Sequence, residues 1–298
     1  MSITARHAPH RYQHFKLFIA ITIVKIFEKL VLEFEFNDNK HFKYPIHSQV
    51  EEIMVNVIVN GALGKMGQES VNAILGQPDL NLVASIDRDD DLQKTIEKTQ
   101  ASVVIDFTHP SCVKSNAIRT INAGCHAIIG TTGLSELDLH ELDNLARQAA
   151  VGIMVIPNFA VGAVLLMKFA AEAAKHMPKV EIIEFHHDKK ADAPSGTAIK
   201  TAEFIANTNS QVNCVALDET ELITGCRGGR KHNIPIHSIR LPGYVASQEV
   251  IMGGIGQTLT IRHDTISRES FMPGVILCVR KINQITGLVY GLENVLEL

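Results

Sequence analysis

The sequence lacks tryptophan altogether and has only five cysteines among its 298 residues. The cysteines are odd in number and never spaced as C-x-x-C, a pattern that fits reduced thiols better than a disulfide framework or a zinc site. We therefore expect a cytoplasmic protein without a metal site. The five are widely scattered along the chain: Cys112, Cys125, Cys214, Cys226 and Cys278.

An excess of charge of either sign is also missing. The chain has 28 basic and 32 acidic residues and a net charge of -4, so there is no electrostatic case for nucleic acid as the main partner. Hydrophobic residues make up 46% and charged residues 20%, which is ordinary for a globular protein and argues against wholesale disorder. The length is sufficient for two modest domains.

Glycine is absent from residues 1–53, although the chain has 20 glycines. The apolar run at 17–24 is far shorter than the roughly 20 residues that a membrane-spanning helix needs, so no membrane association is expected. No small-residue cleavage site follows the run, as a signal peptide would require, and acidic residues are too common after Glu28 for a plastid transit peptide. We interpret residues 1–53 as an extension of unclear role or a misassigned start, with the catalytic protein beginning at or near Met54.

From Met54 onward the pattern is that of alternating strands and helices. Short β-branched runs predict strands, and segments with apolar residues at helical spacing separate them. The stretch DRDDD at 87–91 is predicted to be a polar loop after the second strand. This alternation implies right-handed crossovers and a parallel sheet. The predicted strands are 55–61, 80–87, 101–107, 126–133 and 152–158, and the predicted helices are 65–75, 111–124 and 134–150.

The rhythm changes after Asn158. A long apolar helix at 163–176 leads to a strand at 180–187 and a helix at 195–206, while 211–233 shows no clear element. Strands at 234–241, 248–254 and 257–264 follow without helices between them, which indicates a mixed or antiparallel sheet. A closing apolar segment, 270–282, is predicted to be helical despite Pro273. We expect an α/β protein with a dinucleotide-binding domain of the Rossmann type (54–158 plus about 270–298) and an α+β domain for substrate binding and oligomerisation (159–269).

A glycine-rich loop, GALGKMG at 61–67, follows the first predicted strand and opens a helix. In this context Gly61 permits a tight turn, Gly64 lets the backbone approach a pyrophosphate, and the helix start faces the phosphate charge. Asp87 ends the second strand, where an acidic side chain would accept hydrogen bonds from the adenosine ribose. Arg88 could instead pair with a 2′-phosphate, so both NADH and NADPH fit. A plain β-turn with convenient glycines is the alternative.

Two further strand ends indicate the same crevice, because ligands of open parallel sheets sit beyond the carboxyl ends of the strands. Gly130, Thr131 and Thr132 follow the fourth strand and offer backbone and hydroxyl groups to a ligand. Pro157, Asn158 and Phe159 follow the fifth strand, whereas Phe107 after the third strand is equally well explained as core.

A second centre is the stretch EFHHDKKADAPSGTA at 184–198. The start of the helix that follows Pro194 offers free amides, the helix dipole and two hydroxyl groups, which favour a carboxylate or phosphate. His186 or His187 could act as an acid near neutral pH, and Lys190 could hold an anion or deliver a proton. A solvated strand end and a metal site are the alternatives, and the metal site is disfavoured because Lys189 and Lys190 would repel a cation.

These motifs, from about residue 55 to the C-terminus, resemble those of the dihydrodipicolinate reductases, also called 4-hydroxy-tetrahydrodipicolinate reductases, of lysine and diaminopimelate biosynthesis. The resemblance is carried by GALGKMG, VIDFTHP, IIGTTG, PNFAVG and above all E-x-H-H-x-x-K-x-D-A-P-S-G-T-A. Residues 1–53 are not covered. Asn60, Ala160 and Asp87 depart from residues common in the family.

The resemblance implies a role for each matched position. His186 and Lys190 would be catalytic, as acid/base and proton donor, and they would reduce a cyclic imine bearing two carboxylates. The substrate would be bound by His187, Ser195, Gly196 and Thr197. The NADH or NADPH groove would be lined by Gly61, Ala62, Leu63, Gly64, Lys65, Met66, Asp87, Arg88, Gly130, Thr131, Thr132, Ile156, Pro157, Asn158 and Phe159. The family also implies a homotetramer.

Two rival functions remain at this point. Another Rossmann-type dehydrogenase of the aspartate-family pathway would share the nucleotide domain, and a semialdehyde dehydrogenase would need a nucleophilic cysteine beside a base. Cys112 and Cys125 fall in or after the third crossover helix, and we find no such nucleophile arrangement around them. A module that only senses NADH would need the glycine-rich loop and not EFHHDKK.

Overall fold

The computed structural model describes residues 54–214 and 220–296, so the prediction for residues 1–53 lies outside the described residues. Within the described part of the chain, no helix is both long and apolar enough to cross a membrane.

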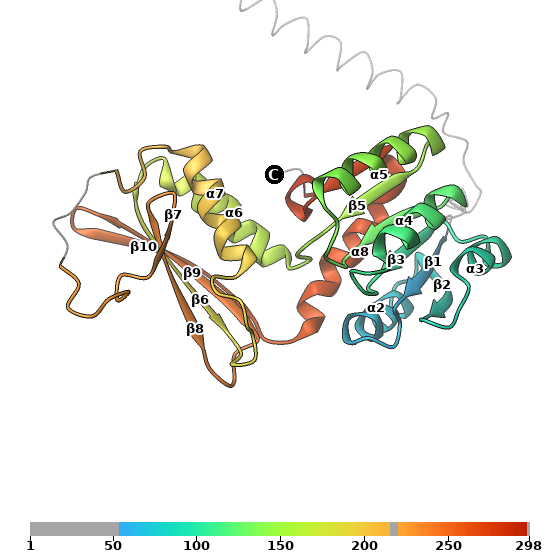
Figure 1. Ribbon diagram of the computed structural model, residues 1–298, viewed down its shortest axis with the longest axis horizontal. Helices are drawn as coiled ribbons and strands as arrows, with labels where there is room; N and C mark the ends of the chain where they lie inside the picture. Colours follow the sequence, from blue (N-terminus) through green and yellow to red (C-terminus); the bar gives the residue numbers. More distant parts are fainter. Residues whose placement is uncertain (1–53, 215–219, 297–298) are drawn as a thin grey trace, which may run out of the picture. The chain divides into compact units, whose positions relative to one another are not determined.

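The first half of the described chain and one strand near its end form a six-stranded parallel sheet in the order β11-β5-β4-β3-β1-β2. Its central strands are buried along their whole length, because helices cover the sheet (Figure 1) and leave no face for alternating polar residues. The predicted parallel sheet is therefore confirmed. The strands are β1 (Val55–Asn60), β2 (Leu80–Ile86), β3 (Val103–Asp106), β4 (His126–Ile129), β5 (Gly152–Val155) and β11 (Gly287–Tyr290), and the helices are α2 (Lys65–Leu75), α3 (Leu92–Thr99), α4 (Val113–Asn122) and α5 (Glu136–Ala149).

Two of these elements, helix α3 and strand β11, were not predicted from the sequence. Helix α3 occupies a stretch that is mostly polar, and the Asp91 side chain caps it by accepting a hydrogen bond from the Lys94 amide. Only Leu92 and Ile96 are buried, so the helix shows little periodicity. Strand β11 has four residues and pairs in parallel with β5. Its register is set by the pairing with β5, which lies more than 130 residues earlier in the chain.

The second sheet has five strands in the order β10-β9-β6-β8-β7. Strand β6 is parallel to β8 and antiparallel to β9, so the predicted mixed sheet is confirmed. Helices α6 and α7 cover one face of this sheet (Figure 1). Strand β7 lies in the segment for which no element was predicted. The bounds are α6 (Val161–Ala174), β6 (Lys179–His186), α7 (Gly196–Thr208), β7 (Gly229–Lys231), β8 (Ile234–Arg240), β9 (Ala246–Gly254) and β10 (Gln257–Thr265).

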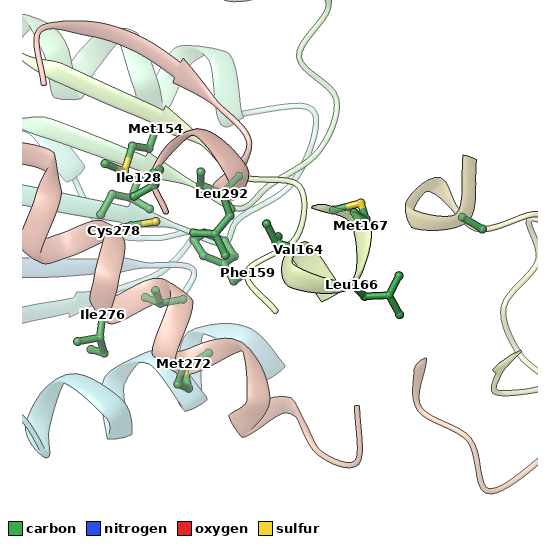
Figure 2. Packing of buried hydrophobic residues seen from close by; sticks show 14 of the residues in the cluster. Ile128, Met154, Phe159, Val164, Leu166, Met167, Met272, Ile276, Cys278 and Leu292 are labelled. Atoms are coloured by element: carbon green, nitrogen blue, oxygen red, sulfur yellow. The ribbon is translucent and has the colours of Figure 1, made fainter. Parts of the chain in front are cut away.

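Helix α8 (Met272–Lys281) confirms the predicted closing helix and tolerates Pro273 because the proline lies in its first turn. Short 3-10 helices flank it at Arg268–Phe271 and Ile282–Gln284, and a third spans Leu292–Asn294. Figure 2 shows Met272, Ile276 and Cys278 of α8 in the same apolar cluster as Phe159 and Leu292. Gly274 allows this approach, since a Cβ there would lie 2.1 Å from the Phe159 carbonyl oxygen.

Candidate active site

The inner face of the five-stranded sheet changes from apolar to polar along its strands. Side chains two residues apart share a face, so Val180 and Ile182 of β6 continue into Glu184 and His186. Strand β9 changes at the same level, where Val250 is followed on this face by Gln248, the residue paired with Glu184. The apolar rows pack on helices, and the polar rows are free to form a site.

Glu184 is the centre of the polar rows and is fully buried. One carboxylate oxygen bonds His186 Nδ1, and the other accepts from Arg240 Nη2 at 2.8 Å and from the Ser195 amide at 3.3 Å. Arg240 also donates to the Asp192 carbonyl oxygen at 2.7 Å. Glu184 thus ties together the end of β6, the end of β8 and the start of α7.

Burial alone would raise the pKa of Glu184, but hydrogen bonds from His186, Arg240 and Ser238 outweigh it and hold that pKa at about 2. Glu184 is therefore a carboxylate at neutral pH. Because His186 Nδ1 faces this carboxylate, the imidazole carries a proton on Nδ1 and its Nε2 is directed away from Glu184.

His187 and Lys190, the other predicted site residues of this stretch, follow β6 and lie in different surroundings from His186. Lys190 donates to both carboxylate oxygens of Asp192 at 2.7 Å, and that ion pair lowers the pKa of Asp192. Asp192 is largely exposed, so the pair is held at the surface. His187 is exposed, and neither it nor Lys190 is among the residues that line the cavity described below.

The start of α7 presents backbone groups to the site. Ser195 caps the helix by accepting from the Ala198 amide at 3.2 Å, which leaves its own position fixed. A Cβ built on Gly196 would meet nothing within 4 Å, so open space lies beside the helix start. The Thr197 hydroxyl oxygen accepts from Asn158 Nδ2 at 3.3 Å, which links this helix to the end of β5.

The glycine-rich loop has the geometry that a pyrophosphate site needs. Gly61 has a φ of +83°, and a Cβ there would lie 2.5 Å from the Phe107 carbonyl oxygen. Among the described residues no side chain caps the first turn of α2, and its first turn holds no acidic residue. The amides at this helix start therefore suit an anionic ligand, and the residues present fit a dinucleotide.

Asp87 lies over this loop and accepts hydrogen bonds from the backbone amides of Leu63 and Arg88 at 3.0 and 2.9 Å. These bonds, that of Arg88 foremost, lower the pKa of Asp87. Arg88 is exposed. A cavity of about 460 Å³ lies beside Asp87 and is lined by Ala62, Leu63, Gln68, Val71, Asn72, Ser85, Ile86, Asp87 and Asp90.

A second buried carboxylate, Asp106 at the end of β3, organises the other strand ends. It accepts from Asn60 Nδ2 at 3.1 Å, from Asn116 Nδ2 at 3.0 Å, and from the Thr108 and Thr131 hydroxyls at 2.7 and 2.8 Å. The bond from Asn60 accounts for a polar side chain at the buried end of β1. The Thr131 hydroxyl donates a hydrogen bond to Asp106, so a ligand would contact Thr131 through its backbone.

His186, the start of α7 and the ends of the parallel strands meet at a cavity of about 300 Å³. The Phe107 ring packs edge-on to Phe159 with centroids 5.5 Å apart, and it lines the cavity instead of being core alone. Of the predicted residues, the lining includes Met66, Gly130, Ile156, Pro157, Asn158, Phe159, His186, Ser195 and Thr197. Gly61, Ala62, Leu63, Gly64, Lys65, Asp87, Arg88, Thr131, Thr132, His187, Lys190 and Gly196 lie outside that lining.

Comparison with protein families covers nearly all of the described chain. A model described as "Dihydrodipicolinate reductase, N-terminus" matches residues 55–159, and one described as "Dihydrodipicolinate reductase, C-terminus" matches residues 162–296. The chain belongs to the dihydrodipicolinate reductase family.

Individual members of the family are similar to this chain over nearly their whole length. A 4-hydroxy-tetrahydrodipicolinate reductase from Syntrophomonas wolfei is 50% identical over 261 residues, covering 80% of this chain and 98% of the relative. One from Desulfitobacterium hafniense is 47% identical and covers 82% and 99%. The solved structure "Dipicolinate bound Dihydrodipicolinate reductase from Paenisporosarcina sp. TG-14" is 40% identical, with a TM-score of 0.76 over 81% of this chain and 99% of that one.

Three residues of the candidate site were missed by reasoning from the sequence. Glu184 was quoted as part of a motif without a role, although it continues the inward-facing positions of β6 after Val180 and Ile182. Its two-residue spacing from Ile182 could have indicated that its side chain lies on the same face of the strand. Arg240 and Gln248 reach the site from β8 and β9, and only the pairing of those strands with β6 reveals their proximity.

Proposed function

We propose that this chain reduces 4-hydroxy-tetrahydrodipicolinate to tetrahydrodipicolinate with NADH or NADPH. The observation that carries the proposal is the cavity in which His186 and the start of α7 face the strand ends Gly130 and Ile156 to Phe159. Family membership supports the same substrate. The cofactor, when bound, supplies a hydride to a ring carbon of the substrate.

The glycine-rich loop and the start of α2 hold the pyrophosphate in this scheme, and Asp87 takes the adenosine ribose. Lys65 and Met66 flank the loop, Gly130 to Thr132 and Ile156 to Phe159 border the nicotinamide, and Ala62, Leu63 and Arg88 lie toward the adenosine. Asp106 positions the strand ends, because neighbouring amide and hydroxyl groups donate to both of its carboxylate oxygens.

One substrate carboxylate binds at the start of α7. The open space beside Gly196 admits it, and the amides of Gly196 and Thr197 with the Ser195 and Thr197 hydroxyl groups surround it. His187, which is exposed at the end of β6, contacts the substrate from the loop.

His186 and Lys190 handle protons. Loss of the 4-hydroxyl group as water gives a conjugated cyclic imine, and addition of a hydride and a proton then gives the product. Glu184 orients His186, so that Nε2 is available for proton transfer. To reach the substrate, Lys190 leaves Asp192, and this requires breaking only an exposed ion pair.

Turnover can be measured in a coupled assay. The upstream synthase generates the substrate from pyruvate and aspartate semialdehyde, and NADH or NADPH absorbance is followed. We expect cofactor oxidation that depends on both the synthase and this protein. Absence of turnover with either cofactor would contradict the function.

The roles of His186 and Lys190 are tested by His186→Gln and Lys190→Met in the same assay. Each should lower kcat by at least about a hundredfold, the usual value of positioned acid–base groups. NADH affinity, measured by fluorescence titration, should be unchanged. Near-normal turnover of both variants would show that the roles are wrongly assigned.

The proposal extends to assembly and location. We propose a homotetramer formed through the outer face of the five-stranded sheet, where Ile183, Phe185, Ile239 and Ile251 are incompletely buried in one chain. Residues 54–158 with 270–298 would bind the dinucleotide, and 159–269 the substrate and neighbouring subunits. Light scattering after gel filtration tests the tetramer, and a monomer would contradict it. The five free cysteines support a cytoplasmic location.

A further inference from the structure

Gln248 is a buried polar residue of β9 that the scheme above does not use. Its side chain lines the cavity and the residue is only 5% exposed. In the sheet it pairs with Glu184 of β6 on one side and with His263 of β10 on the other. It therefore lies in the polar row of the inner face, next to the groups that handle protons.

Hydrogen bonds fix the orientation of the Gln248 amide. Its Nε2 donates to Thr201 Oγ1 at 2.7 Å, and the Thr201 hydroxyl donates to the Thr197 carbonyl oxygen at 2.8 Å. Because the Thr201 proton is engaged, Thr201 can only accept from Gln248, and the amide must present Nε2 to it. The carboxamide oxygen Oε1 is left for another partner.

No donor in residues 54–214 and 220–296 lies within hydrogen-bond distance of Gln248 Oε1, although the atom is buried. A buried acceptor without a partner costs free energy, so a ligand group that donates a hydrogen bond to it would be favoured. The neighbouring Glu184 carboxylate is an acceptor and cannot fill this need. A substrate carboxylate cannot either, since it too only accepts.

We propose that Gln248 is a specificity-determining residue whose Oε1 accepts a hydrogen bond from a neutral O–H or N–H group of the bound ligand. The inference rests on the proposed function, which offers two such donors: the 4-hydroxyl group of the substrate and the carboxamide NH₂ of the nicotinamide. Either would satisfy Oε1. Dipicolinate, an aromatic dicarboxylate without a ring hydroxyl, has no donor of this kind and would not depend on Gln248.

The test compares Gln248→Met with the wild-type protein in the coupled assay. Methionine has nearly the same shape but no hydrogen-bonding amide. Loss of the bond should lower kcat/KM about tenfold. A rise in the KM for the substrate, with unchanged NADH and dipicolinate affinity, identifies the substrate hydroxyl as the donor. A matching loss of NADH affinity identifies the carboxamide.

Thr201→Val is the matched control, because it breaks the Gln248–Thr201 bond from the other end and keeps the Gln248 carboxamide itself. A purely structural role for Gln248 predicts equal effects of the two substitutions on kcat/KM, and that result would overturn the proposal. So would a Gln248→Met protein with wild-type constants for both ligands. Wild-type turnover in the same experiment tests the function itself, so the two failures are distinguishable.

Discussion

Each half of the site contains a buried carboxylate, and the two are satisfied by different kinds of donor. Asp106, among the ends of the parallel strands, accepts only from neutral amide and hydroxyl groups. Glu184, in the mixed sheet, accepts from an imidazole, a guanidinium group and a backbone amide. The first carboxylate has only neutral hydrogen-bond partners, whereas the second has an imidazole and a guanidinium group against it.

This difference separates scaffold from chemistry. Asp106 joins β1, β3, α4 and the loop after β4 by accepting hydrogen bonds from neutral donors, which fixes the edge where a cofactor would lie. Glu184 connects His186, which would transfer a proton, with the start of α7, which would hold the substrate. We infer that changes at Glu184 affect turnover and that changes at Asp106 affect cofactor affinity and stability.

The largest effect is expected for Glu184→Gln. Glutamine at 184 no longer fixes the Nδ1 proton of His186 and leaves Arg240 with a weaker partner, so kcat should fall by about a hundredfold or more in the coupled assay. NADH affinity should stay within a factor of about two of the wild-type value, which is far less than one hydrogen bond is worth. Near-normal turnover would show that Glu184, like Asp106, is not needed for the chemical step.

The pH dependence of stability is the next test. The pKa of Glu184 is about 2 in the folded protein, against an ordinary value of 4.5. A lowered pKa means that the carboxylate stabilises the fold fully above about pH 4.5, and this contribution is lost as the pH falls toward 2. Between pH 5 and 3, wild-type stability relative to Glu184→Gln should fall by about 2 kcal/mol in urea unfolding. Parallel pH profiles would contradict the assignment.

Asp106→Asn should have a smaller and different effect. The isosteric amide turns one acceptor into a donor that faces the hydroxyl or amide donors of its neighbours, which should reduce the free energy of unfolding by about 2 kcal/mol. NADH should bind several-fold more weakly, with kcat at saturating NADH close to wild type. A large loss of kcat at saturating cofactor would show that Asp106 takes part in more than positioning.

The smallest effect on the fold is expected at Gly196. A methyl group there meets no protein atom within 4 Å, so Gly196→Ala should leave the thermal midpoint unchanged. It would occupy the space assigned to a substrate carboxylate, and dipicolinate inhibition should weaken about tenfold, the loss that follows from roughly 1.4 kcal/mol. Unchanged inhibition by dipicolinate would place the carboxylate elsewhere.

The sequence was sufficient for the features that depend on local patterns. The glycine loop, the alternation of buried strands and helices, and the capped start of α7 after Pro194 all follow from neighbouring residues. Strand β11 and helix α3 were missed because one is defined by pairing with a distant strand and the other has two buried residues. The partners of Glu184 and Asp106 were likewise unpredictable, since strand register and loop conformation bring them together.

The central claim is that Glu184 acts through His186, and a double-mutant cycle on kcat tests it most directly. Glu184→Gln, His186→Gln and the double variant are compared with the wild-type protein at saturating substrate and cofactor. If Glu184 only positions His186, the double variant should be as slow as His186→Gln alone. If the two losses multiply in the double variant, Glu184 acts independently of His186 and the account is wrong.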